Sequence, residues 1–189
     1  MLAESPSRDD PVAYVPWWLN ELRECRSLFL VAWSDDAYRK TVLRAYARDF
    51  DATFLECISH RTGKQFLQWL ASGCGLFAGR HTLADLYSAL EDELLSRNYL
   101  VILDEAHLLS LNALGMIRAL HHSIDDHCQY GHDGRSSTST FVLSSGNQEL
   151  VNRLDRVQDF WAYCCCRYHF GVPFSKKEQQ QLDETRRGF

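Results

Sequence analysis

YLVILDEAHLL, residues 99–109, is the stretch from which the rest of the chain is interpreted. Five apolar residues, Tyr99 to Leu103, run without interruption into Asp104 and Glu105. A short unbroken apolar run bounded by polar residues is typical of a strand buried on both faces, as in a parallel sheet. Ligands of such sheets bind just beyond the carboxyl ends of the strands, which is where the two carboxylates are expected to lie.

Two adjacent acids at the end of a buried strand predict a particular chemistry. In P-loop ATPases the first acid holds a magnesium ion and the second polarises the attacking water. These roles would fall to Asp104 and Glu105. The alternative is that the acids only open a helix, where negative charge favours the N-terminal dipole. The strand before the pair and the helix-like pattern after it favour the ATPase interpretation.

The composition is that of an ordinary globular protein and excludes several classes. The formal net charge of -5 gives no basic footprint, so any nucleic-acid binding requires a local patch or an assembled array. Seven cysteines, an odd number with several in apolar segments, indicate buried thiols in a reducing compartment rather than a disulfide framework. No run approaches the roughly 18 apolar residues of a membrane span, and the polar N-terminus is not a secretory signal. We expect a cytoplasmic protein without a membrane segment.

Strand-like and helix-like segments alternate along the chain, which predicts an α/β fold with a largely parallel sheet. The strands are expected at 28–33, 53–58, 99–103 and 140–144, with a last one near 168–172. The helices are expected at 16–25, 41–50, around 66–70, 82–96, from about Ser110, and at 149–156 and 160–166, with loops at 34–40 and 125–138. The clearest helix start is Thr82, because Asp85 three residues later completes a capping box.

The domain organisation follows from these segments. Residues 1–15 are interpreted as a flexible N-terminal lead-in, residues 16–173 as the α/β core, and residues 174–189 as a short polar C-terminal tail. One domain is expected from 189 residues, and this length suffices for a sizeable core.

The order of these segments resembles that of the AAA+ ATPases that regulate DNA transposition, namely the TnsC, TniB and phage Mu B proteins. The resemblance covers residues 16–172. WLNELRECRSLFLVAW (18–33) is similar to their lead helix and first strand, VLRAYARDF (42–50) to the helix after their phosphate loop, and FVLSSGNQELVNRL (141–154) to their sensor strand. HRTGKQFLQWLASGCG (60–75) and the helix from Thr82 to Ser96 are similar to the segments before their second acidic motif.

The resemblance implies a P-loop (AAA+) three-layer core with a largely parallel five-stranded sheet, whose helical lid is reduced or absent. In that case residues 174–189 are either the polar tail or a remnant of the lid. It implies ATP and Mg²⁺ as cofactors, and nucleotide-controlled assembly into a homo- or hetero-oligomer with other AAA+ subunits on DNA. It also implies contact with a transposase or a target-selection protein. No membrane partner is implied.

The phosphate loop departs from the family. A working loop reads G-x-x-x-x-G-K-[ST], and its glycines let backbone N–H groups wrap the phosphates. Placing Lys40 and Thr41 at the end of this pattern puts Ser34 and Arg39 where glycines belong. Under this alignment Ser34, Arg39, Lys40 and Thr41 would face the phosphates, and Thr41 would share the metal with Asp104.

A second alignment, which has no gap before the following helix, puts Arg39 at the lysine and Lys40 at the serine or threonine. Trp33 and Tyr38 then stand at the glycine positions. The first alignment is preferred because it keeps the Lys-Thr dipeptide, but neither restores a glycine. Side chains at the glycine positions obstruct close approach of the backbone to the phosphates. Asp35 and Asp36 also add negative charge where the phosphates would lie.

We therefore expect ATP hydrolysis to be impaired or absent, although the Asp-Glu pair is intact. The leading interpretation is a transposition regulator with weak or lost hydrolysis. The alternative is a nucleotide-independent pseudo-ATPase scaffold or adaptor that pairs with another ATPase. A superfamily-2 helicase fragment, suggested by residues 104–107 (DEAH), is disfavoured because 189 residues cannot hold the two RecA-like domains such enzymes need.

Asn147 and three arginines are further candidates for the nucleotide site. Asn147 follows the strand expected beside residues 99–103, so it is a candidate sensor of the attacking water or the γ-phosphate; an N-cap is the alternative. Arg167, and less so Arg153 and Arg156, are candidates for an arginine finger that reaches a neighbouring subunit, in line with the resemblance. Surface exposure or a weak salt bridge is the alternative for each.

Two more groups have a weaker basis. Five residues, His121, His122, His127, Cys128 and His132, include one zinc half-site spacing but lack a second, so a solvated loop is the default interpretation. Arg61, Lys64 and Arg80 would contact DNA phosphates if the chain forms a ring or filament, an expectation that rests on the resemblance alone.

Overall fold

The computed structural model describes residues 15–17, 19–20, 28–33, 36–59, 62–77, 79, 82–97, 99–130, 139–146, 149–162 and 164–170. Its strands are β1 (Leu28–Trp33), β2 (Thr53–Glu56), β3 (Leu100–Asp104), β4 (Thr140–Ser145) and β5 (Cys164–Phe170). Its helices are α2 (Asp36–Asp49), α3 (Gly63–Gly73), α4 (Leu83–Ser96), α5 (Leu111–Tyr130) and α6 (Glu149–Leu154), with short 3-10 turns η1 (Ala106–Leu108) and η2 (Phe160–Ala162).

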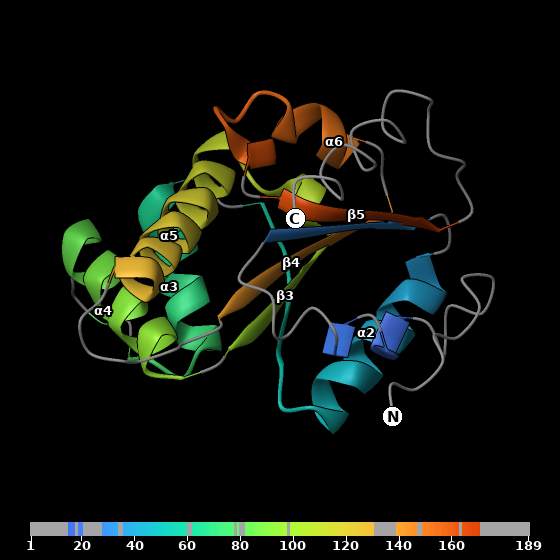
Figure 1. Cartoon of the computed structure of the whole chain (residues 1–189), viewed down its shortest axis with the longest axis horizontal. Helices are drawn as coiled ribbons and strands as arrows, with labels where there is room; N and C mark the ends of the chain where they lie inside the picture. The colour runs from blue at the N-terminus through green and yellow to red at the C-terminus, as the bar shows by residue number, and fades with distance from the viewer. Residues whose placement is uncertain are drawn as a thin grey trace.

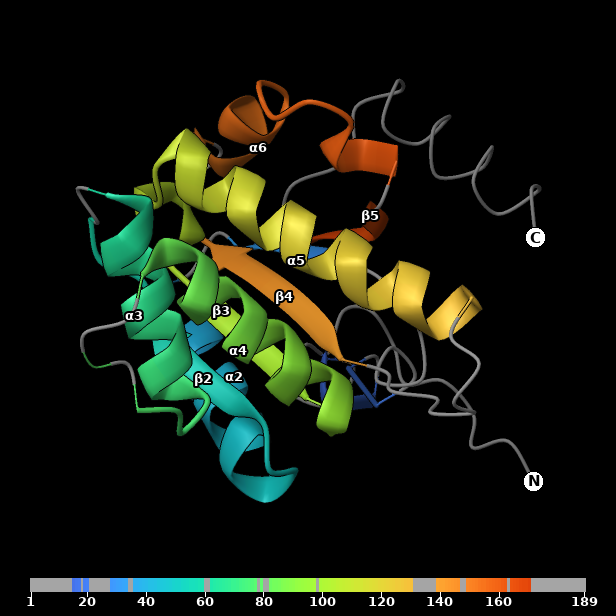
Figure 2. The same ribbon diagram turned by 90° about the vertical axis from the view of Figure 1, so that its left-hand side faces the viewer.

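The five strands form one sheet in the order β2-β3-β4-β1-β5, and every pairing is parallel. Helix α2 lies on one side of this sheet, and α3, α4 and α5 cover the other (Figure 1). The view turned by 90° shows α4 and α5 running across β3 and β4 (Figure 2). The three-layer α/β architecture with a five-stranded parallel sheet, expected from the sequence, is confirmed.

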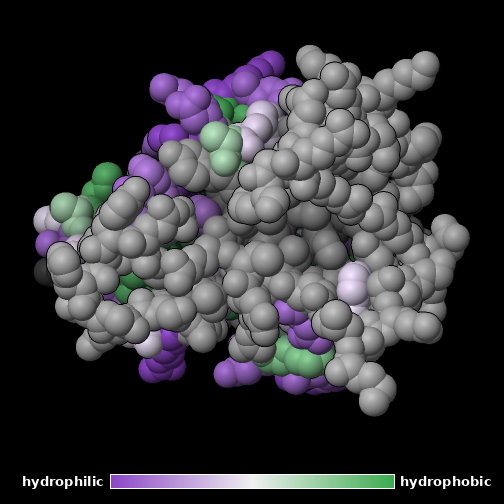
Figure 3. Space-filling model, viewed as in Figure 1, coloured by the Kyte–Doolittle hydropathy of each residue, from purple (hydrophilic) through white to green (hydrophobic). Residues whose placement is uncertain are grey.

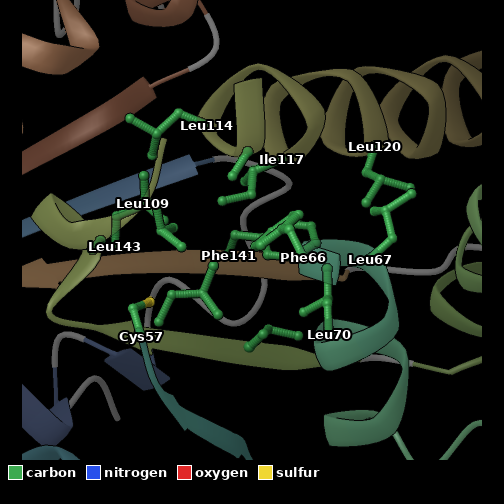
Figure 4. Close-up of a cluster of buried hydrophobic side chains, with 14 of the residues drawn as sticks. Cys57, Phe66, Leu67, Leu70, Leu109, Leu114, Ile117, Leu120, Phe141 and Leu143 are labelled. Atoms are coloured by element: carbon green, nitrogen blue, oxygen red, sulfur yellow. The ribbon is translucent and has the colours of Figure 1, made fainter. Parts of the chain in front are cut away.

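Both faces of β3 and β4 are buried, as expected of parallel strands covered by helices. On the α2 side, Leu100, Ile102 and Val142 pack with Leu43 and Tyr46. On the other side lies a larger apolar cluster, to which β3 contributes Val101 and Leu103. In Figure 4, side chains from α3, α5 and β4 meet in this second cluster. The alternation of residues 100–103 between two cores fixes which face Asp104 points to.

Two helices on the second face begin with a capping box. Thr82 Oγ1 accepts a hydrogen bond from the backbone N–H of Asp85, and the Asp85 carboxylate accepts one from the N–H of Thr82, as predicted. Thr62 and Gln65 make the same reciprocal pair at the start of α3, which was not predicted. Each box satisfies two N–H groups that the helix itself cannot pair.

Three sequence predictions are wrong in detail. The helix expected over 41–50 begins at Asp36, so part of the expected loop 34–40 is helical. Residues 36–40 contain neither glycine nor proline, the residues that would interrupt a helix there. The helix from about Ser110 was expected to end before the loop at 125–138, but α5 continues to Tyr130. The helix expected over 160–166 is replaced by η2 and β5. Strand β5 is formed through its pairing with β1, a distant segment that local periodicity does not reveal.

The surface of the described residues carries few large apolar side chains. Phe77 is 89% exposed and Ile58 is 58% exposed, but they follow different elements, α3 and β2 respectively. On the face shown in Figure 3, the apolar atoms of described residues form small separate patches among hydrophilic ones. Among the helices described, none is both long enough and apolar enough to cross a membrane.

Candidate functional site at the carboxyl ends of the strands

The two acids lie where the sequence predicted, at the carboxyl end of β3. Asp104 is the last residue of the strand and is fully buried. Glu105 follows it and adopts a left-handed backbone conformation, with φ 54° and ψ 36°. Such a conformation is uncommon for a residue other than glycine and persists only where surrounding contacts hold it. The backbone N–H of Cys57, just after β2, donates to the Asp104 carbonyl oxygen at 2.8 Å and holds the neighbouring strand end in place.

The guanidinium of Arg39 binds both acids. Its Nε donates to Asp104 Oδ1 at 2.9 Å, and its Nη2 donates to Glu105 Oε1 at 2.7 Å. Arg39 is 0% exposed, although arginine is almost never fully buried unless it is paired. Its position on α2 explains this placement, because Leu43 and Tyr46, four and seven residues later, lie on the same inward helix face.

A half-exposed layer of charges extends this buried pair toward solvent. Lys40 Nζ lies 2.9 Å from Glu105 Oε1 and 3.0 Å from Glu56 Oε1. Arg44 Nη2 lies 2.6 Å from Glu56 Oε2. One helix, α2, therefore supplies three cations to three carboxylates at the ends of β2 and β3. Because Arg44 and Glu56 are largely exposed, water screens their pair and it contributes less to stability than the buried one.

The pKa shifts show that the network stabilises the charged forms. Burial favours a raised pKa for Glu105, but hydrogen bonds from Lys40 and Arg39 and their charges outweigh it, so this pKa lies below its ordinary 4.5. The hydrogen bond from Lys40 likewise lowers the pKa of Glu56. Hydrogen bonds to Glu105 and Glu56 raise the pKa of Lys40 above 10.5. Near neutral pH these three groups are ionised.

His107 joins Glu105 to the neighbouring strand. Its Nδ1 lies 2.9 Å from Ser145 Oγ, at the end of β4, and 3.4 Å from Glu105 Oε2. The two oxygens share one ring nitrogen, so this is not the relay of a catalytic triad, in which the base uses both ring nitrogens. Sequence reasoning missed this role of His107; its place in DEAH, three residues after Asp104, was the available signal.

Two oxygens at the ends of β3 and β4 are buried without a hydrogen-bond partner among the described residues. They are Oδ2 of Asp104 and Oγ of Ser144, and both residues are 0% exposed. Leu103 pairs with Leu143, so the next residue on each strand, Asp104 and Ser144, lies side by side on the α2 face of the sheet. Buried polar atoms of this kind normally have a partner.

The other predicted site residues are in part outside the described residues, so their roles stay predictions. Thr41 is exposed on α2. Ser34 and Asn147 lie outside the described residues, and Arg167 lies in β5 with its side chain outside the described set. Arg153 donates to the Leu109 carbonyl oxygen and pairs with Glu149.

A pocket separate from this cluster lies beside α6. It is a pocket of about 310 Å³ between the start of α5 and α6, lined by Leu111, Glu149, Asn152, Arg153 and Arg156. The histidine and cysteine candidates lie elsewhere, on and after α5. Among the side chains described, no three histidine, cysteine or acidic residues are placed to hold a metal ion; those of His127, Cys128 and His132 are not described.

As arranged, the residues do not fit a magnesium ion with a bound triphosphate. Mg²⁺ requires oxygen ligands at about 2.0–2.1 Å in octahedral geometry. Asp104 Oδ1 and Glu105 Oε1 instead both accept hydrogen bonds from Arg39, whose guanidinium holds the space beside them. Thr41, the other predicted metal ligand, is exposed on α2, whereas Asp104 is fully buried.

Comparison with known proteins identifies the fold. The family model described as "AAA domain" matches residues 19–154, well over half of the chain. No curated protein matches the chain at a significant level.

Several solved structures resemble the chain at low identity. The ORC2 protein of Aeropyrum pernix, in ADPNP-ADP complexes, is 15% identical with a TM-score of 0.54, covering 99% of this chain and 52% of that one. The Aeropyrum pernix ORC1 protein in complex with DNA is 16% identical (TM-score 0.54), covering 97% of this chain and 50% of that one. A chain of Drosophila ORC bound to DNA is 14% identical (TM-score 0.54), covering 88% of this chain and 93% of that one. The chain thus spans about half the length of the two Aeropyrum proteins, and these likenesses show the fold alone.

Proposed function

Because this chain belongs to the AAA domain family, we propose that it is a regulator of DNA transposition of the TnsC, TniB and phage Mu B type. In this proposal it assembles with AAA+ subunits on DNA, bridges to a transposase or target-selection protein, and has weak or lost ATP hydrolysis. The order of motifs over residues 16–172 supports the transposition role. One observation carries the loss of hydrolysis, namely the binding of both acids, Asp104 and Glu105, by Arg39.

The engagement of Glu105 argues against its use as a general base. To polarise water, a carboxylate must present a free oxygen of suitable basicity. Glu105 Oε1 receives both Arg39 and Lys40, and Oε2 faces His107. The lowered pKa of Glu105 further weakens it as a proton acceptor.

The features with which a phosphate loop binds a triphosphate are also missing from the sequence after β1. A working loop wraps phosphates with backbone N–H groups after the first strand. Here α2 begins at Asp36, and only two residues separate it from the end of β1 at Trp33. The cations of α2 that could attract phosphate are already paired, Arg39 and Lys40 with Glu105 and Arg44 with Glu56. This charge balance supports a site with little affinity for a triphosphate.

The DNA and assembly parts of the proposal rest on relatives and on the resemblance. Structures with the same fold include ORC proteins solved with DNA, such as Aeropyrum pernix ORC1 and Drosophila ORC. With a net charge of -5, DNA contact requires local cations presented repeatedly in an assembly. Lys64, exposed near the start of α3, is the described member of the cations proposed for this contact.

A second candidate function is a nucleotide-independent scaffold that pairs with another ATPase. The network of Arg39, Lys40 and Arg44 favours it, because the strand ends are held together by residues of the chain itself. The two candidates share a silent hydrolytic site and differ in whether ATP controls assembly.

Calorimetry with Mg·ATP and a phosphate-release assay test the proposed loss of hydrolysis. We expect release by the wild type to be no faster than by Glu105→Gln, which lacks the carboxylate but keeps the shape of the side chain. Hydrolysis above the Glu105→Gln background would refute the proposal. Measurable binding without hydrolysis would favour the regulator, and no binding at millimolar ATP would favour the scaffold.

The DNA part is tested by fluorescence anisotropy on a long duplex over a range of salt concentrations, with and without Mg·ATP. We expect binding that weakens with salt and a Lys64→Ala variant with a shallower salt dependence, since each phosphate contact contributes to that slope. Lys64→Arg is the matched control because it keeps the charge. Absence of DNA binding under all conditions would remove this part of the proposal.

A further inference from the structure

We propose that Arg39 is the resident cation of an oxygen-lined site formed by Asp104, Glu105 and Ser144, and that removing its guanidinium turns this site into one for a divalent metal ion. The inference rests on the proposed function, in which the two acids hydrolyse no ATP. It adds that the chain has replaced an exchangeable cation by a covalently attached one.

The ends of the strands carry buried negative charge. Asp104 is fully buried and Glu105 is nearly so, and carboxylates in such surroundings stay ionised only with a cation close by. Arg39 supplies that cation through two charge-assisted hydrogen bonds, at 2.9 and 2.7 Å. Lys40 adds a second positive charge from the solvent side, where its side chain is 28% exposed. The strand ends therefore require positive charge.

Two buried oxygen atoms at the strand ends are not used by Arg39. Asp104 Oδ2 and Ser144 Oγ have no hydrogen-bond partner among the described residues, and both residues are fully buried. The sheet register places them side by side on the face that Arg39 approaches. Carboxylate and hydroxyl oxygens are hard ligands that suit Mg²⁺, Mn²⁺ and Ca²⁺. The site thus offers more oxygen ligands than a guanidinium uses.

The Arg39 guanidinium and a dissolved metal ion would compete for the same acids. Arg39 is attached to α2, whose inward face is fixed by Leu43 and Tyr46, so its effective concentration at the acids is high. A dissolved ion must displace this tethered group. Truncation at residue 39 removes the competitor, while the strand pairing keeps Asp104 and Ser144 side by side.

The experiment uses the full chain, stripped with EDTA and free of nucleotide, and compares wild type with Arg39→Ala. Thermal unfolding is followed with MgCl₂, MnCl₂ or CaCl₂ alone, and Mn²⁺ binding is measured directly by electron paramagnetic resonance. We expect the wild-type midpoint to stay unchanged. The Arg39→Ala midpoint should rise steadily with each tenfold increase in metal, with one Mn²⁺ bound per chain.

Two matched variants locate the effect. Arg39→Ala combined with Asp104→Asn should lose the metal response, because a principal ligand has lost its charge. Arg44→Ala, which removes an exposed cation of the same helix, should show none. If Arg39→Ala is unfolded without metal, restoration of its circular dichroism spectrum and cooperative unfolding by metal supports the inference, and failure to fold with metal overturns it.

The remaining outcomes separate this inference from the proposed function. A folded Arg39→Ala variant without metal-dependent stabilisation or Mn²⁺ binding would overturn the inference. So would metal binding by wild type that Asp104→Asn abolishes, since Arg39 would then not occupy the site. ATP hydrolysis by the wild type, measured in the same preparation, would refute the proposed function and leave the metal response of Arg39→Ala to be judged by itself.

Discussion

Arg39 Nε lies 2.9 Å from Asp104 Oδ1, and the side chains of both residues are completely buried although they are 65 positions apart in the sequence. This ion pair fastens α2 to the end of β3. Removing both charges from water costs desolvation energy, which offsets much of the attraction between them, so a buried ion pair is not by itself a net gain in stability. Breaking it from one side, in contrast, leaves an uncompensated buried charge.

We therefore predict that Arg39→Ala lowers the free energy of unfolding by about 3–5 kcal/mol, the usual cost of removing one partner of a buried pair. Urea unfolding at neutral pH without divalent metal measures the change. Arg44→Ala is the control, because its pair with Glu56 is largely exposed, and exposed pairs contribute about 0–1 kcal/mol. Equal effects of the two variants would contradict the assigned difference in burial.

The fold was largely predictable because its main signals are local. The unbroken apolar run before Asp104 indicated a buried parallel strand, and β3 is buried throughout. Thr82 and Asp85 indicated a helix start through side chains only three residues apart. β1 was predicted with its observed ends, Leu28 and Trp33.

The site was less predictable because its decisive contacts are distant in the sequence. Nothing local to Arg39 shows that its partners are two acids after the third strand. The preferred alignment of the phosphate loop kept Lys40 and Thr41 together, whereas in the structure Arg39 is the residue aimed at Asp104 and Thr41 is exposed. β5 was missed over 164–167 for a related reason, since its partner strand is β1, more than a hundred residues earlier.

A second prediction concerns the capping box of α4. Thr82→Ala removes the acceptor for the Asp85 N–H and should destabilise the protein by about 0.5–2 kcal/mol. Thr82→Ser keeps the hydroxyl and should stay close to wild type. The midpoint of urea unfolding at constant slope measures both. Similar losses for the two variants would show that the methyl group, not the hydrogen bond, matters at this position.

A third prediction contrasts two helical glycines. A Cβ at Gly115, within α5, would meet no atom within 4 Å, so Gly115→Ala should stabilise the protein by about 0.5–1 kcal/mol through backbone entropy. A Cβ at Gly73, the last residue of α3, would lie 2.5 Å from Leu55 Cδ2, so Gly73→Ala should be destabilising. Thermal unfolding of the two variants should shift in opposite directions; a shift in the same direction would contradict the packing at one of them.

The last prediction is a pH dependence from Glu105. Its pKa in the folded protein lies below the ordinary 4.5 that it regains on unfolding, so the unfolded chain takes up the proton first as pH falls. The stabilisation is therefore fully present above about pH 4.5 and is lost as pH falls through the folded-state pKa. Urea unfolding from pH 7 to pH 3 should show that the wild type exceeds Glu105→Gln by a constant amount near neutrality and by a shrinking amount below 4.5.

Lys40 allows the same network to be tested at alkaline pH. Its pKa in the folded protein is raised above 10.5, so its contribution is fully present below that pH and is lost as pH rises through the folded value. Lys40→Met should therefore differ from wild type at neutral pH and converge with it under alkaline conditions. If the Glu105→Gln difference instead stayed constant down to pH 3, or the Lys40→Met difference persisted at alkaline pH, then the ionised forms of these side chains would not be what holds α2 to the ends of β2 and β3.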